Sequence, residues 1–322
     1  MNVLIDWGKI EKLIDADYSK GKSVVGKPSY SGLLLFKMCL LQSWYGLSDH
    51  EVEDRLNDSI SFGYFCGMNI DAIAPDHSTL SRFRTALTKT KTFEKLFASV
   101  NAQLEAHNII VTKGIIVDAS VIDTPLRPKG KTNHKVTEDR TEEDENEVIV
   151  KKEYADSVDK DSTWLKKRGK YHFGFKKHHI TDQEGLILGV LTTTASVNEI
   201  ANLEEVLDTV NVDLPENTPL GGDKGYQSEK NALLLKKRKL KNRILKKAQK
   251  NKPLTHWEKK FNRFISKTRF KVERTFGGIK RRFDGGLARY RGMEKMHTKN
   301  LTEAMCYNLY RSPGIVATNS QN

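Results

Sequence analysis

Three carboxylate residues occupy positions from which they could bind a metal ion. The first, Asp118, interrupts the apolar stretch GIIVDASVID at residues 114–123, which has the composition of a buried strand and no cationic residue of its own. A carboxylate buried without a counter-charge costs several kcal/mol or takes up a proton. We therefore expect a distant part of the chain or a bound metal to neutralise Asp118.

Asp223 and Glu273 have related surroundings. Asp223 ends the short stretch TPLGGD ahead of Gly225, and these residues are equally compatible with a simple turn. Glu273 lies in the segment SKTRFKVERTFGGIKRRF, where helical spacing places it in one stripe with Arg269 and Lys280. Taken alone, Glu273 would form an ordinary helical ion pair worth about 0.3 kcal/mol.

The three acids together indicate a site for hard divalent cations. A sheet with one packed helix can bring two strand-borne aspartates and a helix-borne glutamate to one point. Mg²⁺ prefers such oxygen ligands and retains water molecules that a phosphate substrate can replace. In a two-metal site, one ion activates the attacking water or hydroxyl group and the other stabilises the departing oxygen. The pattern therefore predicts metal-assisted chemistry on a phosphodiester.

The apolar pattern predicts the elements that would position these acids. Residues 1–110 show helical periodicity, and the pattern then changes to the alternating and continuous apolar runs of strands. The expected order is mixed α/β rather than doubly wound. We expect strands at residues 114–123, 171–182, 186–196 and 218–223, a turn at 182–185, and helices at 199–210 and from Ser228. The helix that carries Glu273 is expected to bury one apolar side, formed by Phe264, Ile265, Val272, Phe276 and Ile279.

Two short helices inside the N-terminal region have clear start signals. Ser48 or Asp49 can cap the first, and Asp76 or Ser78 can cap the second, which carries Arg82 and Arg84 near its start. The pair is compatible with a helix-turn-helix that binds DNA, but the signal is weak because ordinary capped helices with surface arginines are common.

Charge is concentrated in one part of the chain. The net charge is +13, but the segment from Lys236 to Arg282 alone carries 20 Lys or Arg residues against two acids, so the rest is slightly acidic. A solvated helix face would mix both signs, and a basic block of this size favours a nucleic-acid partner. An acidic insert near residues 134–163 is expected to be an exposed loop that is merely solvated or competes with DNA for the basic surface. Residues 312–322 are expected to form a disordered tail.

Other features narrow the class of protein. Cys39, Cys66 and Cys306 are far apart and odd in number, which argues against a disulfide framework or a zinc site. The apolar run near residue 40 is interrupted by Lys37, and the N-terminus lacks the features of a secretory signal. We expect a cytoplasmic protein that contacts no membrane.

In three motifs the chain resembles the DDE transposases of bacterial insertion sequences, in the group called insertion sequence family five. The matching stretches are VDAS at residues 117–120, GDKGY at 222–226 and RFKVERTFGGIKR at 269–281, and PDHSTLSRFR at 75–84 is similar to the helical domain of that family. The resemblance covers about residues 25–311. It implies an α/β, ribonuclease-H-like mixed sheet with flanking helices over residues 111–311, preceded by an all-α domain at 1–110 for DNA binding and dimerisation.

The resemblance also implies roles for individual residues. Asp118, Asp223 and Glu273 would form the catalytic and metal-binding triad, with two Mg²⁺ ions that Mn²⁺ can replace. The residues expected to contact DNA are Arg269, Lys280, Arg281, Lys224, Tyr226, Arg82 and Arg84. The signature of the related transposases has a tyrosine where this chain has Ser266. Partners would be double-stranded DNA, both the element's ends and the target, and a second copy of the chain in a nucleoid-associated homodimer on DNA.

Two other functions are compatible with the same residues. A nuclease of the same fold would cleave nucleic acid without joining the products. A catalytically inactive DNA-binding protein would be either a regulator that binds DNA through residues 47–87 or an inactive descendant of a transposase. The sequence leaves open the recognised end sequence, the target preference and the route of second-strand cleavage.

Overall fold

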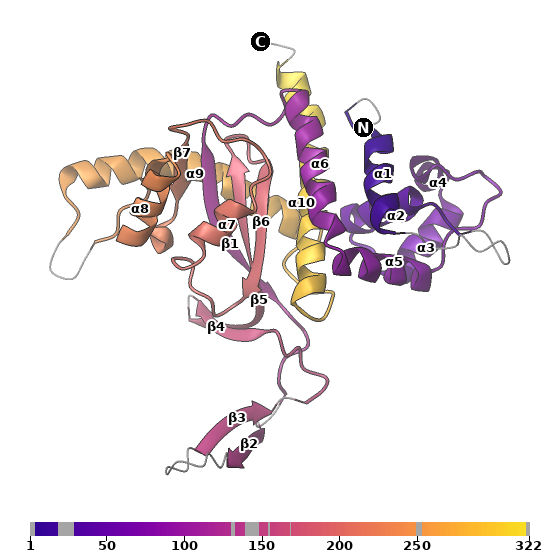
Figure 1. Ribbon diagram of the computed structural model, residues 1–322, viewed down its shortest axis with the longest axis horizontal. Coiled ribbons are helices and arrows are strands. Elements are labelled where there is room, and N and C mark those ends of the chain that lie inside the picture. Colours follow the sequence, from indigo (N-terminus) through magenta and orange to yellow (C-terminus); the bar gives the residue numbers. More distant parts are fainter. Residues whose placement is uncertain are drawn as a thin grey trace.

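The structure, a computed structural model, describes residues 4–18, 29–129, 133–138, 148–153, 155–167, 169–248 and 253–319, of which 133–138, 148–153, 267–269, 271 and 317–319 are described by their backbone alone. Six helices come first along the chain and a mixed sheet with further helices follows (Figure 1). The N-terminal helices are α1 (Trp7–Asp17), α2 (Gly32–Tyr45), α3 (Asp49–Asp58), α4 (Ile60–Cys66), α5 (His77–Lys89) and α6 (Thr92–Ala106). The expected helical region up to residue 110 is thus confirmed.

The sheet is built around β1. It contains β1 (Ile115–Asp123), β4 (Thr163–Lys167), β5 (Lys170–Asp182), β6 (Ile187–Thr194), β7 (Pro219–Gly222) and β8 (Lys241–Ile244). β5 pairs antiparallel with β1 and β6, whereas β7 pairs parallel with β1 and β8. The resulting order β6-β5-β1-β7-β8, with β4 added beside β5, is a ribonuclease-H-like mixed sheet. The fold class inferred from the sequence is confirmed.

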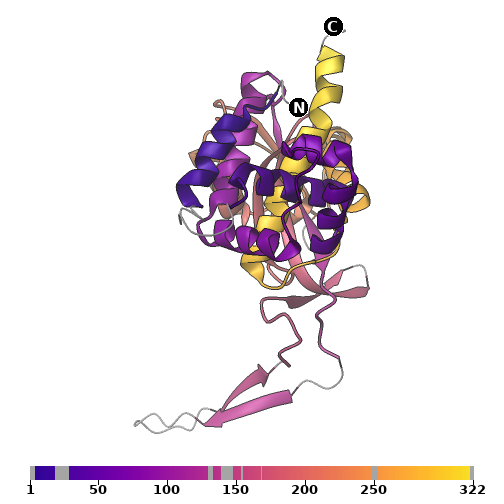
Figure 2. The same cartoon turned by 90° about the vertical axis from the view of Figure 1, so that its right-hand side faces the viewer.

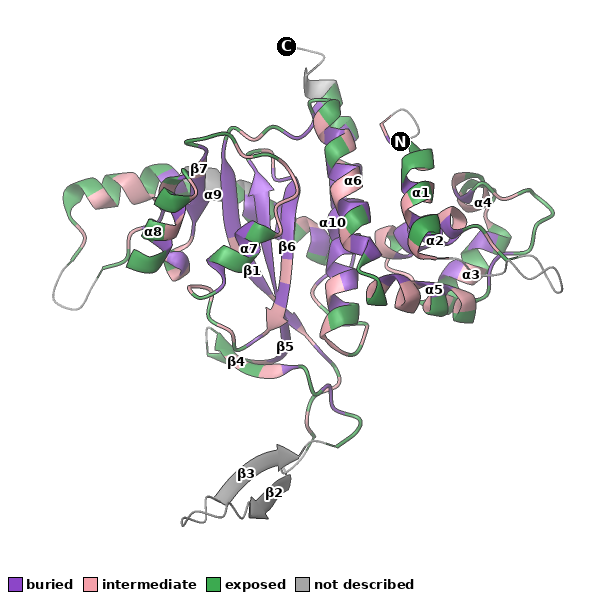
Figure 3. Ribbon diagram, in the orientation of Figure 1, coloured by how far each residue is buried: buried purple, intermediate pink, exposed green. Residues whose placement is uncertain are grey.

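Helices cover both faces of the sheet. The remaining helices are α7 (Leu203–Asp208), the 3₁₀ turn η1 (Lys224–Tyr226), α8 (Glu229–Lys237), α9 (His256–Arg282) and α10 (Met293–Asn319). Burial is continuous along the central strands, while the outer faces of the helices are exposed (Figure 3). Among the described helices, none is both long and apolar enough to cross a membrane.

The acidic insert differs from the expected loop. Its two flanks, β2 (Asn133–Glu138) and β3 (Val148–Glu153), pair as a separate antiparallel ribbon that projects from the body of the molecule (Figure 2). The most acidic residues, 139–147, lie outside the described part of the chain. Val136 pairs with Val150, and the β-branched run at residues 148–150 favours a strand, which the acidic composition of the insert obscures.

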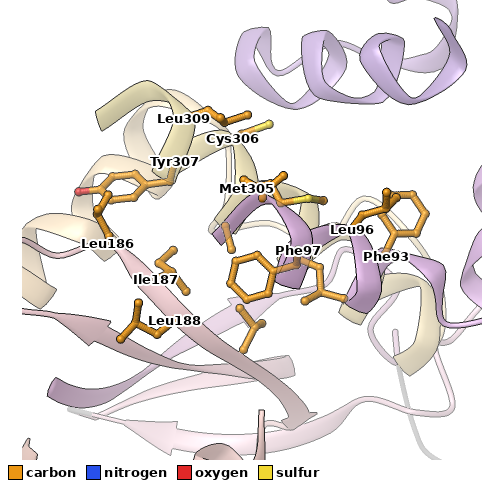
Figure 4. Close-up of a cluster of buried hydrophobic side chains, with 14 of the residues drawn as sticks. Phe93, Leu96, Phe97, Leu186, Ile187, Leu188, Met305, Cys306, Tyr307 and Leu309 are labelled. Carbon is orange, nitrogen blue, oxygen red and sulfur yellow. The ribbon is translucent and has the colours of Figure 1, made fainter. Parts of the chain in front are cut away.

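The helical region and the sheet share one hydrophobic core. Helices α6 and α10 lie side by side between the other N-terminal helices and β6 (Figures 1 and 2). Figure 4 shows Phe97 of α6 and Met305 of α10 packed toward Ile187 of β6, and all three belong to one buried cluster. The three cysteines are buried, as small core residues. A boundary at residue 110 therefore divides the sequence pattern but not the packing.

Helix α10 corrects the expectation of a disordered C-terminal tail. It continues through residues 312–319, and Ile315 is buried in the shared core. Pro313 lies inside this helix. Among the side chains described in this last stretch, only Ser312 and Ile315 are buried, and Pro313, Gly314 and Val316 are exposed, so the sequence shows little apolar pattern there.

A buried amide network joins α6, α10 and β6. The Asn308 side-chain oxygen accepts the Ile187 N–H at 2.8 Å, and its nitrogen donates to the Ile187 carbonyl and to Asn101 Oδ1, each at 2.8 Å. Both asparagines are fully buried. The network therefore satisfies the backbone N–H and carbonyl of Ile187 at the start of β6, where the register with β5 shifts.

Replacing Asn308 with Leu should lower the free energy of unfolding by about 3 kcal/mol. The substitution keeps the volume but leaves a buried N–H and an amide oxygen without partners, and each such group costs about 1–3 kcal/mol. The measurement is denaturant unfolding, with the exposed Asn69→Leu as control. Equal midpoints for the two variants would contradict this role.

Candidate active site

The two aspartates lie next to each other on paired strands. Val117 of β1 pairs with Gly222 of β7 in parallel register. The next residue on β1 is Asp118, and the residue directly after β7 is Asp223. Hydrogen-bonded strands are about 4.8 Å apart. A side chain at Gly222 would approach Val117 Cγ1 to 2.9 Å, so glycine permits this close pairing. The sheet thus places both carboxylates at one position along its central strands.

Both aspartates also contact backbone N–H groups. Asp118 is half-buried, and its Oδ1 accepts the Ala119 N–H at 2.9 Å. Asp223 caps the turn η1, and its Oδ1 accepts the Lys224 N–H at 2.7 Å. Asp223 is therefore a turn residue as well as a strand-end carboxylate, so the two interpretations of the DKGY sequence are compatible.

Helix α9 crosses the sheet on the side of Asp118. Val272 and Phe276 of α9 form a buried cluster with Ile116 of β1. Alternate residues of a strand share a face, so Asp118 points to the same side as Ile116. Glu273 follows Val272 directly and is exposed. The packing brings the helix that carries the third acid over the strand that carries the first.

Most of the expected apolar side of α9 is confirmed. Ile265, Val272, Phe276 and Ile279 are buried, but Phe264 is 64% exposed. Phe264 adjoins Ile265, so helical geometry turns the two side chains about 100° apart and only one can face the core.

The donor set at this position fits a hard divalent cation. Asp118, Asp223 and Glu273 offer oxygen ligands only, and an open site of this kind suits Mg²⁺ or Mn²⁺. Among the described residues, these three carboxylates do not form a trio with all ligand atoms within 4.8 Å of one another. Two ions about 4 Å apart would span a wider group of ligands than a single ion.

Tyr226, which the sequence predicted to contact DNA, is buried. Its ring is fully buried, and its hydroxyl lies 3.4 Å from His178 Nδ1. Burial raises the pKa of the Tyr226 phenol well above its usual range, and the negative charges of Glu199, Asp118 and Asp223 raise it further. Tyr226 therefore supports the floor of the site and cannot contact DNA as expected.

The basic residues near the site differ in exposure. Lys224, Lys280 and Arg281 are exposed and are available for phosphate contacts. Burial of part of its stem lowers the pKa of Lys280, and the neighbouring Lys167 lowers it further. The side chain of Arg269 lies outside the described residues, so its expected role stays a prediction.

The N-terminal helices confirm the caps but change the role of one arginine. Ser48 caps α3 and Asp76 caps α5, with α4 between them, so the two capped helices are not consecutive. Arg82 is exposed. Arg84 instead forms a two-pronged ion pair with Asp49, at 2.9 and 2.7 Å.

Arg84 also stacks on Tyr290, with 4.8 Å between the guanidinium carbon and the ring centroid. It joins α5 to α3 and to the segment before α10, so it braces the molecule and does not face DNA as expected. The sequence could not reveal this role because Tyr290 lies more than 200 residues away.

Within the described part of the chain, one cluster on the N-terminal helices has metal-type ligands close together. His50, Glu53 and His77 bring their ligand atoms within 4.8 Å. However, Glu53 Oε2 accepts both the backbone N–H and the ring Nδ1 of His77, at 2.8 and 2.9 Å. The rings of His50 and His77 lie 3.7 Å apart between centroids and are tilted by 31°, so they pack against each other. Glu53 therefore binds the first N–H of α5, beside the Asp76 cap.

Comparison with known proteins assigns both parts of the chain. Residues 111–309 match the family model described as Transposase DDE domain, and residues 1–86 match the model described as Transposase domain (DUF772). The curated transposase for insertion sequence element IS1106 of Neisseria meningitidis serogroup B is 34% identical over 233 residues, which cover 72% of this chain and 76% of that protein.

Two solved structures are similar at lower identity. The synaptic complex of piggyBac transposase with hairpin DNA is 11% identical, with a TM-score of 0.45, over 98% of this chain and 73% of that chain. The Mos1 transposase paired-end complex with the left transposon end is 9% identical, with a TM-score of 0.24, over 96% and 85%. Both TM-scores are below 0.5, so the sequence matches carry the comparison.

Proposed function

Because the chain belongs to the family of transposases with a DDE domain, we propose that it cleaves DNA at the ends of an insertion sequence and joins the freed 3′ ends to target DNA. The observation that carries the proposal is the pairing of Val117 with Gly222, which sets Asp118 beside Asp223. Helix α9, with Glu273, packs over the same strand.

The family implies dependence on a divalent metal, and we assign Mg²⁺, with two ions per site, to Asp118, Asp223 and Glu273. The ions would activate the attacking oxygen and stabilise the departing one. In the first step, water attacks the phosphodiester at the element's end, leaving a 3′ hydroxyl and a 5′ phosphate. In the second, that hydroxyl attacks a target phosphodiester and releases a target 3′ hydroxyl. The first step hydrolyses one phosphodiester bond, and the second exchanges one phosphodiester bond for another, so the number of these bonds changes only in the first.

The chain's basic residues would hold the DNA. Lys224 follows Asp223 directly, whereas Lys280 and Arg281 lie on α9; all three are exposed and would contact phosphates near the cleaved bond. The basic segment from Lys236 to Arg282 contains the end of α8, all of β8 and all of α9, so its charge extends along one arm of the molecule (Figure 1). Two ends must be processed together, and a homodimer on DNA would supply two sites.

The deciding experiment incubates the protein with duplexes carrying the element's terminal inverted repeats, in Mg²⁺, together with a plasmid target. We expect 3′-end cleavage and joined products. Cleavage without joining would favour a nuclease of the same fold. Retarded migration of the DNA with no cleavage in Mg²⁺ or Mn²⁺ would favour a catalytically inactive DNA-binding protein.

The salt dependence of DNA binding tests the basic segment separately. Changing the exposed Lys236, Lys237 and Lys247 to Gln should reduce the slope of log affinity against log salt by about 0.9 for each lost phosphate contact. The matched control changes Lys9, Lys12 and Lys113 to Gln. These lysines are also exposed, and replacing them removes the same amount of charge from other parts of the protein. Equal slopes for the two triple variants would mean that only net charge attracts the DNA.

A further inference from the structure

The turn between β6 and α7 carries a fourth acid toward the aspartates. Residues 199–210 were expected to form a helix, but α7 begins only at Leu203, and Asn198 instead caps a turn through an Ile200 N–H to Oδ1 bond of 3.2 Å. This late start leaves Glu199 in the turn. Its side chain extends to the GDKGY segment, two residues beyond Asp223.

Gly225 is shaped around this carboxylate. A Cβ on Gly225 would lie 2.7 Å from Glu199 Oε2, closer than side chains approach one another. The φ angle of Gly225 is not in the left-handed region, so the backbone does not require glycine there. What the glycine provides is room for the Glu199 carboxylate at a position two residues beyond Asp223.

Three carboxylates therefore share the surroundings of one buried group. After burial, the charges that raise the pKa of the Tyr226 phenol are those of Glu199, Asp118 and Asp223, in that order. Tyr226 lies beside Gly222 and Val117, on the side of β1 opposite Ile116 and α9. Glu199 thus lies near the same buried ring as Asp118 and Asp223.

Glu199 also has a cationic neighbour. Its Oε1 lies 3.6 Å from Lys176 Nζ, which is buried and donates a shorter hydrogen bond of 2.7 Å to the Val197 carbonyl. The two oxygens of Glu199 therefore face different groups, with Oε1 toward Lys176 and Oε2 toward Gly225. A structural role in neutralising Lys176 predicts different results from a role at the metal.

We propose that Glu199 is a fourth carboxylate of the divalent-metal site and binds the cation held by Asp223, directly or through one water molecule. This inference rests on the proposed function. It assigns to the site a residue outside the three acids that the sequence motifs indicate.

The test measures binding of Mn²⁺ alone to the DNA-free protein by electron paramagnetic resonance. The Glu199→Gln variant should bind Mn²⁺ about 10-fold to 100-fold more weakly, the range typical when a residue supporting a metal site is lost. The control is Glu204→Gln, which removes the same charge from an exposed acid on α7. Equal affinities for these two variants would overturn the inference.

A second variant tests the same point without removing any charge. Gly225→Ala keeps every acid but forces the Glu199 carboxylate to move, so it should reproduce the weaker Mn²⁺ binding. Gly277→Ala on α9, where a Cβ would meet nothing within 4 Å, is its control. Wild-type affinity in Gly225→Ala would contradict the proposed placement of Glu199.

The Lys176→Met and Glu199→Gln double variant separates the two roles. If Glu199 only neutralises Lys176, the double variant recovers wild-type Mn²⁺ affinity and the inference fails. If Glu199 serves the metal, affinity stays low. Asp118→Asn is measured in parallel: weaker binding in Asp118→Asn but not in Glu199→Gln rejects this inference alone, whereas unchanged binding in both rejects the proposed metal site itself.

Discussion

Replacing Asp118 with Asn will slow DNA cleavage by at least about 10³-fold and leave the affinity for end DNA unchanged. Asparagine keeps the size and shape of the side chain but removes the charge that would hold a divalent cation. A metal ion supplies several kcal/mol of stabilisation to the transition state, and about 4 kcal/mol corresponds to a factor of 10³ in rate. The measurement is single-turnover nicking of a labelled end duplex, alongside a mobility-shift titration.

The control for Asp118→Asn is Asp213→Asn, an exposed aspartate in the segment before β7. It makes the same chemical change away from the site and should cleave at the wild-type rate. The thermal midpoint of Asp118→Asn should be no lower than that of the wild type, because a half-buried charge is removed. Cleavage by Asp118→Asn within tenfold of the wild type would reject the assignment of the metal site.

The positions of β1 and β7 could be predicted from the sequence because the local pattern of apolar residues and glycines determines where these strands form. The run around Asp118 and the Gly-rich stretch before Asp223 form β1 and β7, within a residue or two of the expected bounds. Their parallel pairing also follows from the ribonuclease-H-like order. The convergence of Glu273 with them depends on side-chain positions along α9 and stays a prediction.

Other elements could not be read from local pattern. Strand β8 lies within the basic segment, and its four residues Lys241–Ile244 form a strand because β7 offers a parallel partner. The burial of Arg84 and Tyr226 depends on partners distant in sequence, such as Asp49 and His178. Residue type suggested DNA contacts for both, but type alone does not report exposure.

A cluster of buried charged residues near the end of α9 also depends on partners that are distant in sequence. Lys177 of β5 and Lys299 of α10 are buried and both form ion pairs with Glu303, which is also buried. Lys177 Nζ lies 2.7 Å from Glu303 Oε2 and 2.7 Å from the Gly285 carbonyl. These contacts tie the end of α9 to the sheet, and no periodic pattern in the sequence predicts them.

Replacing Glu303 with Gln will lower the free energy of unfolding by about 3–5 kcal/mol, because removing one partner of a buried ion pair leaves uncompensated charge. Here two ammonium groups would lose their anion. Denaturant unfolding of Glu303→Gln measures the loss, and Glu294→Gln, exposed in the first turn of α10, is the control. If the destabilisation comes from stranded charge, adding Lys177→Met and Lys299→Met to Glu303→Gln will recover part of it. A triple variant less stable than Glu303→Gln alone would instead assign the cost to packing.

The same cluster sets a pH dependence that supports this account. Burial raises the pKa of the Glu303 carboxyl, but the ammonium groups of Lys177 and Lys299 outweigh burial and lower it to about 2. A carboxyl whose folded-state pKa is depressed stabilises the fold above its unfolded pKa, near 4.5, and this contribution is lost as the pH falls toward 2. The difference in stability between wild type and Glu303→Gln should therefore shrink between about pH 4.5 and pH 2. A difference that stays constant across this range would show that Glu303 stabilises the fold by its shape and hydrogen bonds, with its charge contributing nothing.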